Sequence, residues 1–99
     1  MKGHVDLLLL ATLRRGPLHG YAVVETLRGA SEGAFDLAEG TVYPALYRLE
    51  GAGLLTSRWT TSGGRRRRVY RLTRRGREEL ARERKEWTAF ARAIEAVVT

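Results

Sequence analysis

The chain has 99 residues, a formal net charge of +7 at neutral pH and no cysteine. A chain of this length has room for one domain with a modest core, and the lack of cysteine excludes disulfides, thiolate metal sites and thiol nucleophiles. His4 and His19 stand alone in the sequence, without the spacing of a metal-binding pair. No glycine-rich phosphate loop or nucleophile elbow is present. We therefore expect a protein that is not an enzyme and carries no metal or cofactor.

The positive charge is concentrated in residues 51–77. This stretch has nine arginines and no carboxylate, whereas residues 1–50 have five basic and six acidic side chains, and residues 78–99 have four and five. A solvated edge strand needs only a few charges to discourage aggregation, and nine arginines repel one another. The stretch therefore predicts a surface that binds a polyanion.

The N-terminal part of the chain predicts two helices followed by a loop. Residues 4–14 are apolar on nearly every side, which indicates a buried helix, and we expect Leu8 to contact a second subunit. The apolar run within it is too short to span a membrane, and it lacks the features of a signal peptide, so we expect a cytoplasmic protein with no membrane partner. Residues 20–29 have the apolar spacing of a second helix, at whose start His19 packs or caps, and residues 31–36 have the composition of a loop.

Residues 39–52 predict a third helix with one apolar stripe and small or polar residues opposite. At 100° per residue the stripe consists of Val42, Leu46 and Leu49. Pro44 is tolerated if this helix begins near Thr41, because the missing N–H then lies in the first turn. An earlier start would place the proline where it kinks the helix, so the start of this helix stays open.

The C-terminal half predicts a hairpin and a long helix. Residues 54–61 and 68–73 are rich in β-branched and aromatic residues, and Ser62-Gly63-Gly64 between them predicts a turn. Residues 74–98 predict a helix that Thr73 caps. Its apolar residues form a heptad seam interrupted by Glu83: Leu80, Trp87, Phe90, Ile94 and Val97. Too little chain remains to cover this seam, so we expect a second copy to cover it.

This order of elements predicts a mainly α winged helix-turn-helix. Residues 1–73 form the DNA-binding domain, with three helices and a two-stranded β wing, and residues 74–99 form a dimerisation helix. The major groove of B-DNA admits one α-helix, and the wing arginines then meet phosphates or the minor groove. The predicted DNA contacts are Thr41, Tyr43, Pro44, Tyr47 and Arg48 on the third helix and Gly64, Arg65, Arg66, Arg67 and Arg68 in the wing. Ordinary packing of the tyrosines, and an ion pair of Arg48 with Glu39 or Glu50, remain alternatives.

Four segments resemble the PadR-like transcriptional regulators. They are HGY at 19–21, GTVYPALYRLE at 40–50, GLL at 53–55 and YRLTRRG at 70–76. The resemblance covers about residues 7–80 and implies a dimeric bacterial winged-helix protein, usually a repressor that a small molecule releases from DNA. It implies that Tyr43 and Arg48 lie in the DNA-contacting helix and residues 63–68 in the wing. It also implies that Trp87 or Phe90 lines a pocket between subunits for a small hydrophobic effector.

The resulting hypothesis is a homodimeric transcriptional regulator that binds a pseudo-palindromic operator in double-stranded DNA. The expected dimer contacts are Leu8, Leu80, Trp87, Phe90, Ile94 and Val97. Two other hypotheses fit the same charge pattern. One is a winged-helix module that docks on an acidic protein, and the other is a non-specific nucleic-acid-binding domain.

Overall fold

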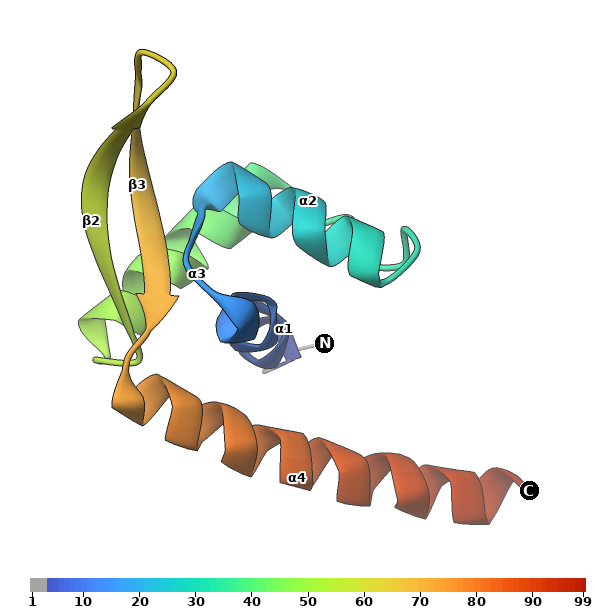
Figure 1. Ribbon diagram of the computed structural model, residues 1–99. Helices are drawn as coiled ribbons and strands as arrows, with labels where there is room; N and C mark the ends of the chain where they lie inside the picture. The colour runs from blue at the N-terminus through green and yellow to red at the C-terminus, as the bar shows by residue number, and fades with distance from the viewer. Residues whose placement is uncertain (1–3) are drawn as a thin grey trace.

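A computed structural model describes residues 4–99 and has the predicted mainly α winged-helix architecture. Its elements are α1 (His4–Thr12), the 3-10 helix η1 (Leu13–Arg15), β1 (Leu18–His19), α2 (Gly20–Ala30), α3 (Glu39–Gly51), β2 (Leu55–Ser62), β3 (Arg65–Leu72) and α4 (Arg74–Val98). In Figure 1 the first three helices lie together beside the β2–β3 hairpin, while α4 runs past them and extends well beyond. Within residues 4–99, no helix combines the length and the apolar character needed to cross a membrane.

The core forms where α1, α2, α3, the base of the sheet and the start of α4 meet. The buried residues that make it are Leu9, Leu10, Leu13, Val23, Val24, Val42, Ala45, Leu46, Leu49, Leu55, Tyr70, Leu72 and Leu80. The apolar stripe of the third helix enters this core as predicted. Tyr70 and Leu72 of β3 are both buried, because alternate residues of a strand share one face.

The sheet has one strand more than the sequence predicted. Strands β2 and β3 pair antiparallel from Leu55–Leu72 to Ser62–Arg65, and β1 adds to the other side of β3, giving the order β1-β3-β2. A two-residue strand leaves no alternating pattern in a sequence, so β1 was missed. Strand β3 also begins three residues earlier than predicted, because consecutive arginines have no strand signature of their own and become a strand only by pairing with β2.

The hairpin turns through Gly63 and Gly64, both with positive φ, at +57° and +78°. Two-residue loops of this kind match the right-handed twist of the flanking strands, and glycine adopts them at little cost. The glycine pair predicted as a turn is therefore the wing tip.

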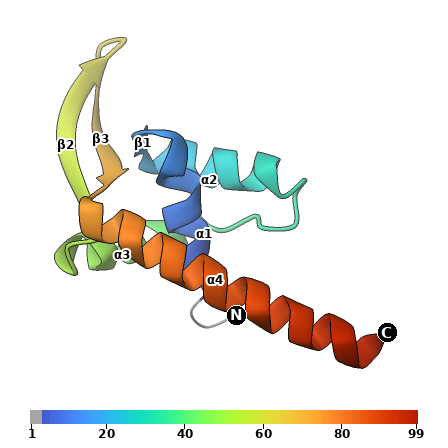
Figure 2. The same cartoon turned by 60° about the horizontal axis from the view of Figure 1, so that its bottom comes forward.

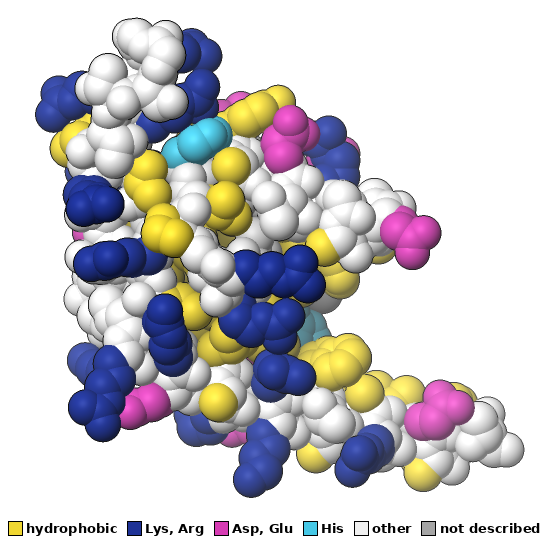
Figure 3. All heavy atoms as spheres, viewed as in Figure 1, with side chains coloured by type: hydrophobic (Ala, Val, Ile, Leu, Met, Phe, Trp, Pro, Cys, Tyr) yellow, Lys and Arg dark blue, Asp and Glu magenta, His cyan; other side chains and the backbone are white. Residues whose placement is uncertain are grey.

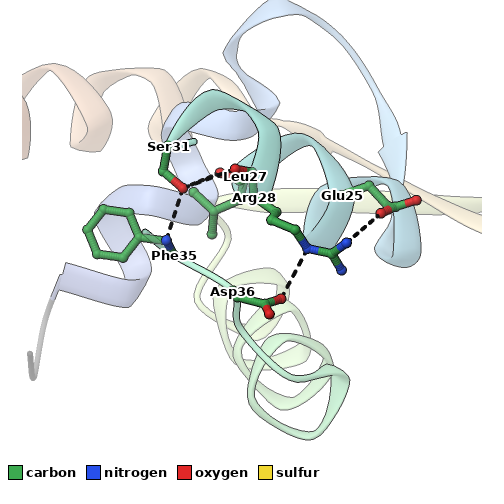
Figure 4. A network of polar contacts seen from close by, with 6 residues as sticks. All are labelled: Glu25, Leu27, Arg28, Ser31, Phe35 and Asp36. Atoms are coloured by element: carbon green, nitrogen blue, oxygen red, sulfur yellow. Dashed lines mark hydrogen bonds and ion pairs between the residues drawn. The ribbon is translucent and has the colours of Figure 1, made fainter. Parts of the chain in front are cut away.

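A small polar network joins the end of α2 to the segment before α3 (Figure 4). The Ser31 hydroxyl donates to the Leu27 carbonyl at 2.8 Å and accepts from the Phe35 N–H at 2.9 Å. Arg28 donates from Nε to the Asp36 carboxylate at 3.1 Å. The contacts of Phe35 and Asp36 tie the loop back onto α2 and so help to set the angle between α2 and α3.

Helix α3 begins at Glu39, and its N-cap residue, Ala38, makes no side-chain hydrogen bond. Pro44 consequently lies inside the helix, beyond the first turn. Its missing N–H leaves the Gly40 carbonyl, four residues earlier, without an intrahelical donor. Both residues lie on the exposed face of α3, where water can satisfy that carbonyl.

Helix α4 is fixed to the body at its start. The Thr73 hydroxyl accepts from the Gly76 N–H at 3.0 Å, as the predicted cap, and donates to the Gly53 carbonyl at 2.6 Å. Leu80 is only 5% exposed and packs in the core. The prediction that Leu80 begins an exposed dimer seam is wrong, because α1 lies against the first turns of α4, which Figure 2 shows crossing in front of it.

Candidate nucleic-acid interface

The outer face of α3 is open to solvent. Val42 and Leu49 anchor the helix in the core, while Thr41, Pro44 and Tyr47 lie on the opposite side. Tyr47 is 57% exposed. An α-helix with one face packed and the other face unpartnered has the form that enters a major groove.

Tyr43 lies on the flank of α3 that faces α2 and is half-buried. Its ring packs directly on Gly20, the first residue of α2, so closely that a Cβ at that position would collide with it. Burial raises the pKa of Tyr43, and the negative charge of Glu39 raises it further. The phenol is thus fixed in place as a neutral hydrogen-bonding group.

One groove joins α3 to the wing and to the start of α2. Its walls are His19, Gly20, Tyr21, Tyr43, Tyr47, Trp59, Arg66, Arg67, Arg68 and Tyr70. All four tyrosines of the chain line it. The structure therefore brings two of the five predicted residues of α3, Tyr43 and Tyr47, together with three of the predicted wing arginines around a single depression, whereas Thr41, Pro44 and Arg48 do not line it.

Trp59 organises the arginines on one face of the wing. It lies opposite Arg68 in the β2–β3 register, and the guanidinium carbons of Arg66 and Arg68 lie 4.6 Å and 5.5 Å from its ring centroid. These distances are within the range of cation–π attraction. The tryptophan aligns two positive charges along the groove. In Figure 3 basic side chains follow the hairpin side of the molecule.

Arg68 is partly neutralised. Its Nε donates to the Ser57 hydroxyl at 2.8 Å, and Nη2 lies 3.6 Å from the carboxylate of Glu50 on α3. The Ser57 hydroxyl in turn donates to Glu50 at 2.7 Å. This network joins the base of the wing to α3. Arg68 therefore holds the wing in position against α3, and its charge is less available to a ligand than that of its neighbours.

Arg67 packs against His19, the N-cap of α2. The His19 Nδ1 accepts from the Ala22 N–H at 3.2 Å, and Arg67 Nη1 lies 3.4 Å and 3.1 Å from the two ring nitrogens. Such similar distances place the guanidinium over the ring. Burial lowers the pKa of His19, and the charge of Arg67 lowers it further, so the imidazole stays neutral and Nδ1 stays free to cap. Capping by His19 was predicted.

Arg48 does not extend freely from α3. Its guanidinium donates twice to the carboxylate of Asp6 on α1, at 3.0 Å and 2.6 Å, and this hydrogen bonding raises the pKa of Arg48. Arg48 thus lies on the flank of α3 toward α1, and its contact with DNA stays a prediction. The ion pair considered as an alternative, with Glu39 or Glu50, is not the one that forms, because the partner of Arg48 is Asp6.

Helix α4 presents an exposed apolar strip. Trp87, Phe90, Ile94 and Val97 are 49%, 56%, 46% and 85% exposed, and Figure 3 shows hydrophobic side chains along this helix. Near α1 the strip opens into a hollow lined by His4, Asp6, Leu7, Arg82, Glu83, Glu86, Trp87 and Phe90. Leu8 is half-buried and lies in a separate apolar hollow with Leu27 and Phe35.

The family model described as the transcriptional regulator PadR-like family matches residues 9–82. The chain belongs to this family. The transcriptional regulator Rv3488 of Mycobacterium tuberculosis is 39% identical over 77 residues, which are 78% of this chain and 69% of that protein.

Solved structures of PadR-like and related regulators have the same fold. A transcriptional regulator from Clostridium thermocellum matches with a TM-score of 0.90 and 28% identity, over 99% of this chain and 93% of that one. A PadR family regulator from Clostridium difficile matches with a TM-score of 0.85 and 29% identity, over 98% and 100%. Bacillus subtilis PadR in complex with operator DNA matches with a TM-score of 0.72 and 28% identity, over 79% of this chain and 45% of that one.

Three residues of this PadR-like site escaped sequence reasoning. Asp6 has no local signal, since its partner is 42 positions away. Gly20 stands within the family-like HGY segment but gives no hint that a tyrosine ring covers it. Tyr70 stands within the family-like YRLTRRG segment, but the register that brings it beneath the groove comes from pairing with Ser57.

Proposed function

We propose that this PadR-like regulator is a homodimeric repressor that binds a pseudo-palindromic operator in double-stranded DNA. The observation that carries the proposal is the shared groove, which joins the exposed face of α3 to the wing arginines. A helix that enters the major groove then has cationic side chains beside it for the flanking phosphates. The match to Bacillus subtilis PadR, solved with operator DNA, supports this partner.

The exposed face of α3 reads the bases in this proposal. Thr41 and Tyr47 carry hydroxyls that donate to or accept from base edges, and Pro44 offers an apolar surface. Arg65 and Gly64 at the wing tip reach the next stretch of backbone or the minor groove. Arg48 adds a phosphate contact only when it leaves Asp6.

A second copy covers the α4 strip. The strip is apolar and exposed, and α4 extends away from its own core (Figure 1), so two strips packed together about a two-fold axis remove it from water. The axis relates two copies of α3, which enter major grooves about one helical turn, ~34 Å, apart. That spacing is the reason for a pseudo-palindromic operator.

Release by an effector uses the hollow between α1 and α4. Trp87 and Phe90 supply flat apolar surfaces, and Arg82 and Glu86 supply polar groups at its edge. A small hydrophobic molecule held there in one dimer geometry shifts the population toward that geometry. If that geometry misplaces the α3 helices relative to the groove spacing, the operator is released.

Selection of bound fragments from sheared genomic DNA at near-physiological salt tests the proposal. We expect one enriched inverted repeat, bound ~10³-fold or more tightly than random duplex. The Arg65→Ala/Arg66→Ala double variant should weaken binding to all duplexes and reduce the salt slope by up to about two units, while Arg92→Ala on the far face of α4 serves as control. Equal affinity for every fragment would contradict operator recognition.

A further inference from the structure

The hydroxyl of Tyr70 is the starting point for a more specific site. Tyr70 is 1% exposed, and among the described residues its hydroxyl has no hydrogen-bond partner. An unpaired buried hydroxyl is costly. Tyr70 is nevertheless part of the groove between α2, α3 and the wing. The hydroxyl therefore lies beneath the surface of this groove, next to the Tyr47 phenol, as a buried donor without a partner at hydrogen-bond distance among the described residues.

The charges around this hydroxyl favour a negatively charged ligand. Arg66 and Arg67 line the same groove, and Arg66 is exposed. The start of α2 also lies there, at Gly20 and Tyr21, and the N-terminus of a helix carries a partial positive charge that favours anions. None of the described residues that line the groove is acidic. Glu50, whose charge acts on Tyr70, is matched by Arg68, and Glu39 acts on Tyr43.

The other tyrosines add neutral donors at the rim. Tyr47 is 57% exposed, and Tyr43 is held over Gly20. Burial raises the pKa of Tyr70 to about 12, and the adjoining Tyr47 phenol contributes in the same direction. The hydroxyls of Tyr43 and Tyr70, whose pKa values are both raised, therefore keep their protons at neutral pH and donate rather than accept toward an anionic oxygen.

We propose that this groove seats one backbone phosphate of the DNA duplex, between Arg66, Arg67 and the start of α2. The tyrosine hydroxyls, including that of Tyr70, donate to its oxygens. Rotation of the exposed Tyr47 side chain gives the phosphate access to the deeper hydroxyl. The inference rests on the proposed function, and it assigns His19, Gly20, Tyr21 and Tyr70 to backbone positioning, with the α3 face left to read bases.

The Tyr70→Phe variant separates a ligand role from a structural one. Removal of a hydroxyl that has no partner in the free protein should leave the midpoint of urea unfolding unchanged or raise it. The same change should weaken binding to a labelled duplex about tenfold, as expected for one lost hydrogen bond to a charged group. Because no charge is removed, the slope of log affinity against log salt should stay constant, whereas Arg67→Ala should lower it by about one unit.

A duplex with single neutral methylphosphonates at successive positions gives the second arm. Each contacted phosphate should weaken wild-type binding when it is neutralised. At one of these positions in each half-site Tyr70→Phe should lose nothing further, because both changes remove the same contact. Additive losses at every position would overturn the proposal. The proposal would also be overturned if Tyr70→Phe bound the duplex with full affinity while Arg65→Ala/Arg66→Ala bound it more weakly. That result would still agree with the proposed function, in which the wing binds DNA. Wild-type protein that binds no duplex even at low salt would instead refute the proposed function itself.

A third arm distinguishes the duplex from free phosphate as the source of the anion. Calorimetry with inorganic phosphate, matched to sodium chloride at equal ionic strength, should show no saturable binding that depends on Tyr70. The role on DNA would be overturned if phosphate bound saturably in a way that depends on Tyr70 while Tyr70→Phe kept full affinity for the duplex. The groove would then be a site for a small anion.

Discussion

The guanidinium of Arg48 on α3 and the carboxylate of Asp6 on α1 face each other through two hydrogen bonds, at 3.0 Å and 2.6 Å. Asp6 also lines the hollow against α4, beside Glu83 and Trp87. The carboxylate of Asp6 thereby connects Arg48, on the helix with the candidate DNA contacts, to the face of the molecule where α4 leaves the core.

Removal of this pair should have a small and salt-dependent effect on stability. Both side chains are partly open to water, at 59% and 27% exposure, and pairs of this kind contribute about 0.2–1 kcal/mol. We expect Asp6→Asn to lower the free energy of unfolding by an amount in this range in dilute buffer, and by less at high salt. Urea titrations at two salt concentrations measure it. A loss that does not diminish with salt would mean that Asp6 acts through packing instead.

Gly20→Ala should disturb the groove and the fold together. The added Cβ would meet the ring of Tyr43, and overpacking of this kind costs about 1–3 kcal/mol. Gly40→Ala is the matched control, because nothing lies within reach of a Cβ there and alanine favours a helix by up to about 1 kcal/mol over glycine. The midpoint temperature of thermal unfolding should fall for Gly20→Ala and rise for Gly40→Ala. Equal midpoints for Gly20→Ala and wild type would show that the tyrosine ring moves aside freely.

Thr73→Ala should detach the start of α4 from the body. The change removes both the helix cap to Gly76 and the hydrogen bond to the Gly53 carbonyl. Loss of the cap alone costs about 1 kcal/mol. We therefore expect the free energy of unfolding, measured by urea titration, to decrease by about 1–2 kcal/mol. Thr73→Ser keeps the hydroxyl and should retain most of this stability. If serine proves as damaging as alanine, the methyl group rather than the hydroxyl is what matters.

Glu83 should make stability fall as pH rises toward neutrality. Burial raises its pKa to about 7, with further increases from the hydrogen bond and charge of Glu79 and from the charge of Asp6, while Arg82 opposes them. The folded protein then holds a proton that the unfolded chain has already released, so its stability decreases between about pH 4.5 and 7 and stays level above. Hydrogen bonding from Glu83 lowers the pKa of Glu79, so Glu79 acts oppositely, and its contribution is lost in acid.

Glu83→Gln tests this directly, since the amide still donates to Glu79 but carries no charge. We expect the variant to be more stable than wild type at pH 8 and about equal at pH 4, as measured by urea unfolding at each pH. Glu95→Gln, at an exposed position of the same helix, should leave the pH profile unchanged. A wild-type profile that rises steadily from pH 4 to 8 would contradict the assignment.

Trp87→Ala should weaken the proposed dimer. Truncation of a central aromatic anchor in an interface costs about 2 kcal/mol or more, which is roughly a 30-fold change in dissociation constant. Sedimentation at decreasing concentration measures it, with Lys85→Ala on the opposite face of α4 as control. A variant that stays as dimeric as wild type when diluted would remove Trp87 from the interface.

Local pattern in the sequence was enough to predict most of the fold. The stripe of Val42, Leu46 and Leu49, the glycine turn and the Thr73 cap each depend on residues close together in the chain. The errors have a common cause, because β1, the start of β3 and the burial of Leu80 all depend on elements distant in sequence. Strand pairing and the packing of α1 decided them.

For the candidate site, the sequence by itself determined the chemistry: an arginine-rich hairpin, a helix with one open face, and the family-like segments that imply DNA. Only the tertiary structure decided how these charges are used. Arg48 and Arg68 meet carboxylates, Arg66 and Arg67 stay at a groove, and the Tyr70 hydroxyl is left beneath it. The physical reason is that composition fixes which groups can interact, whereas pairing energies depend on distances that only the folded chain sets.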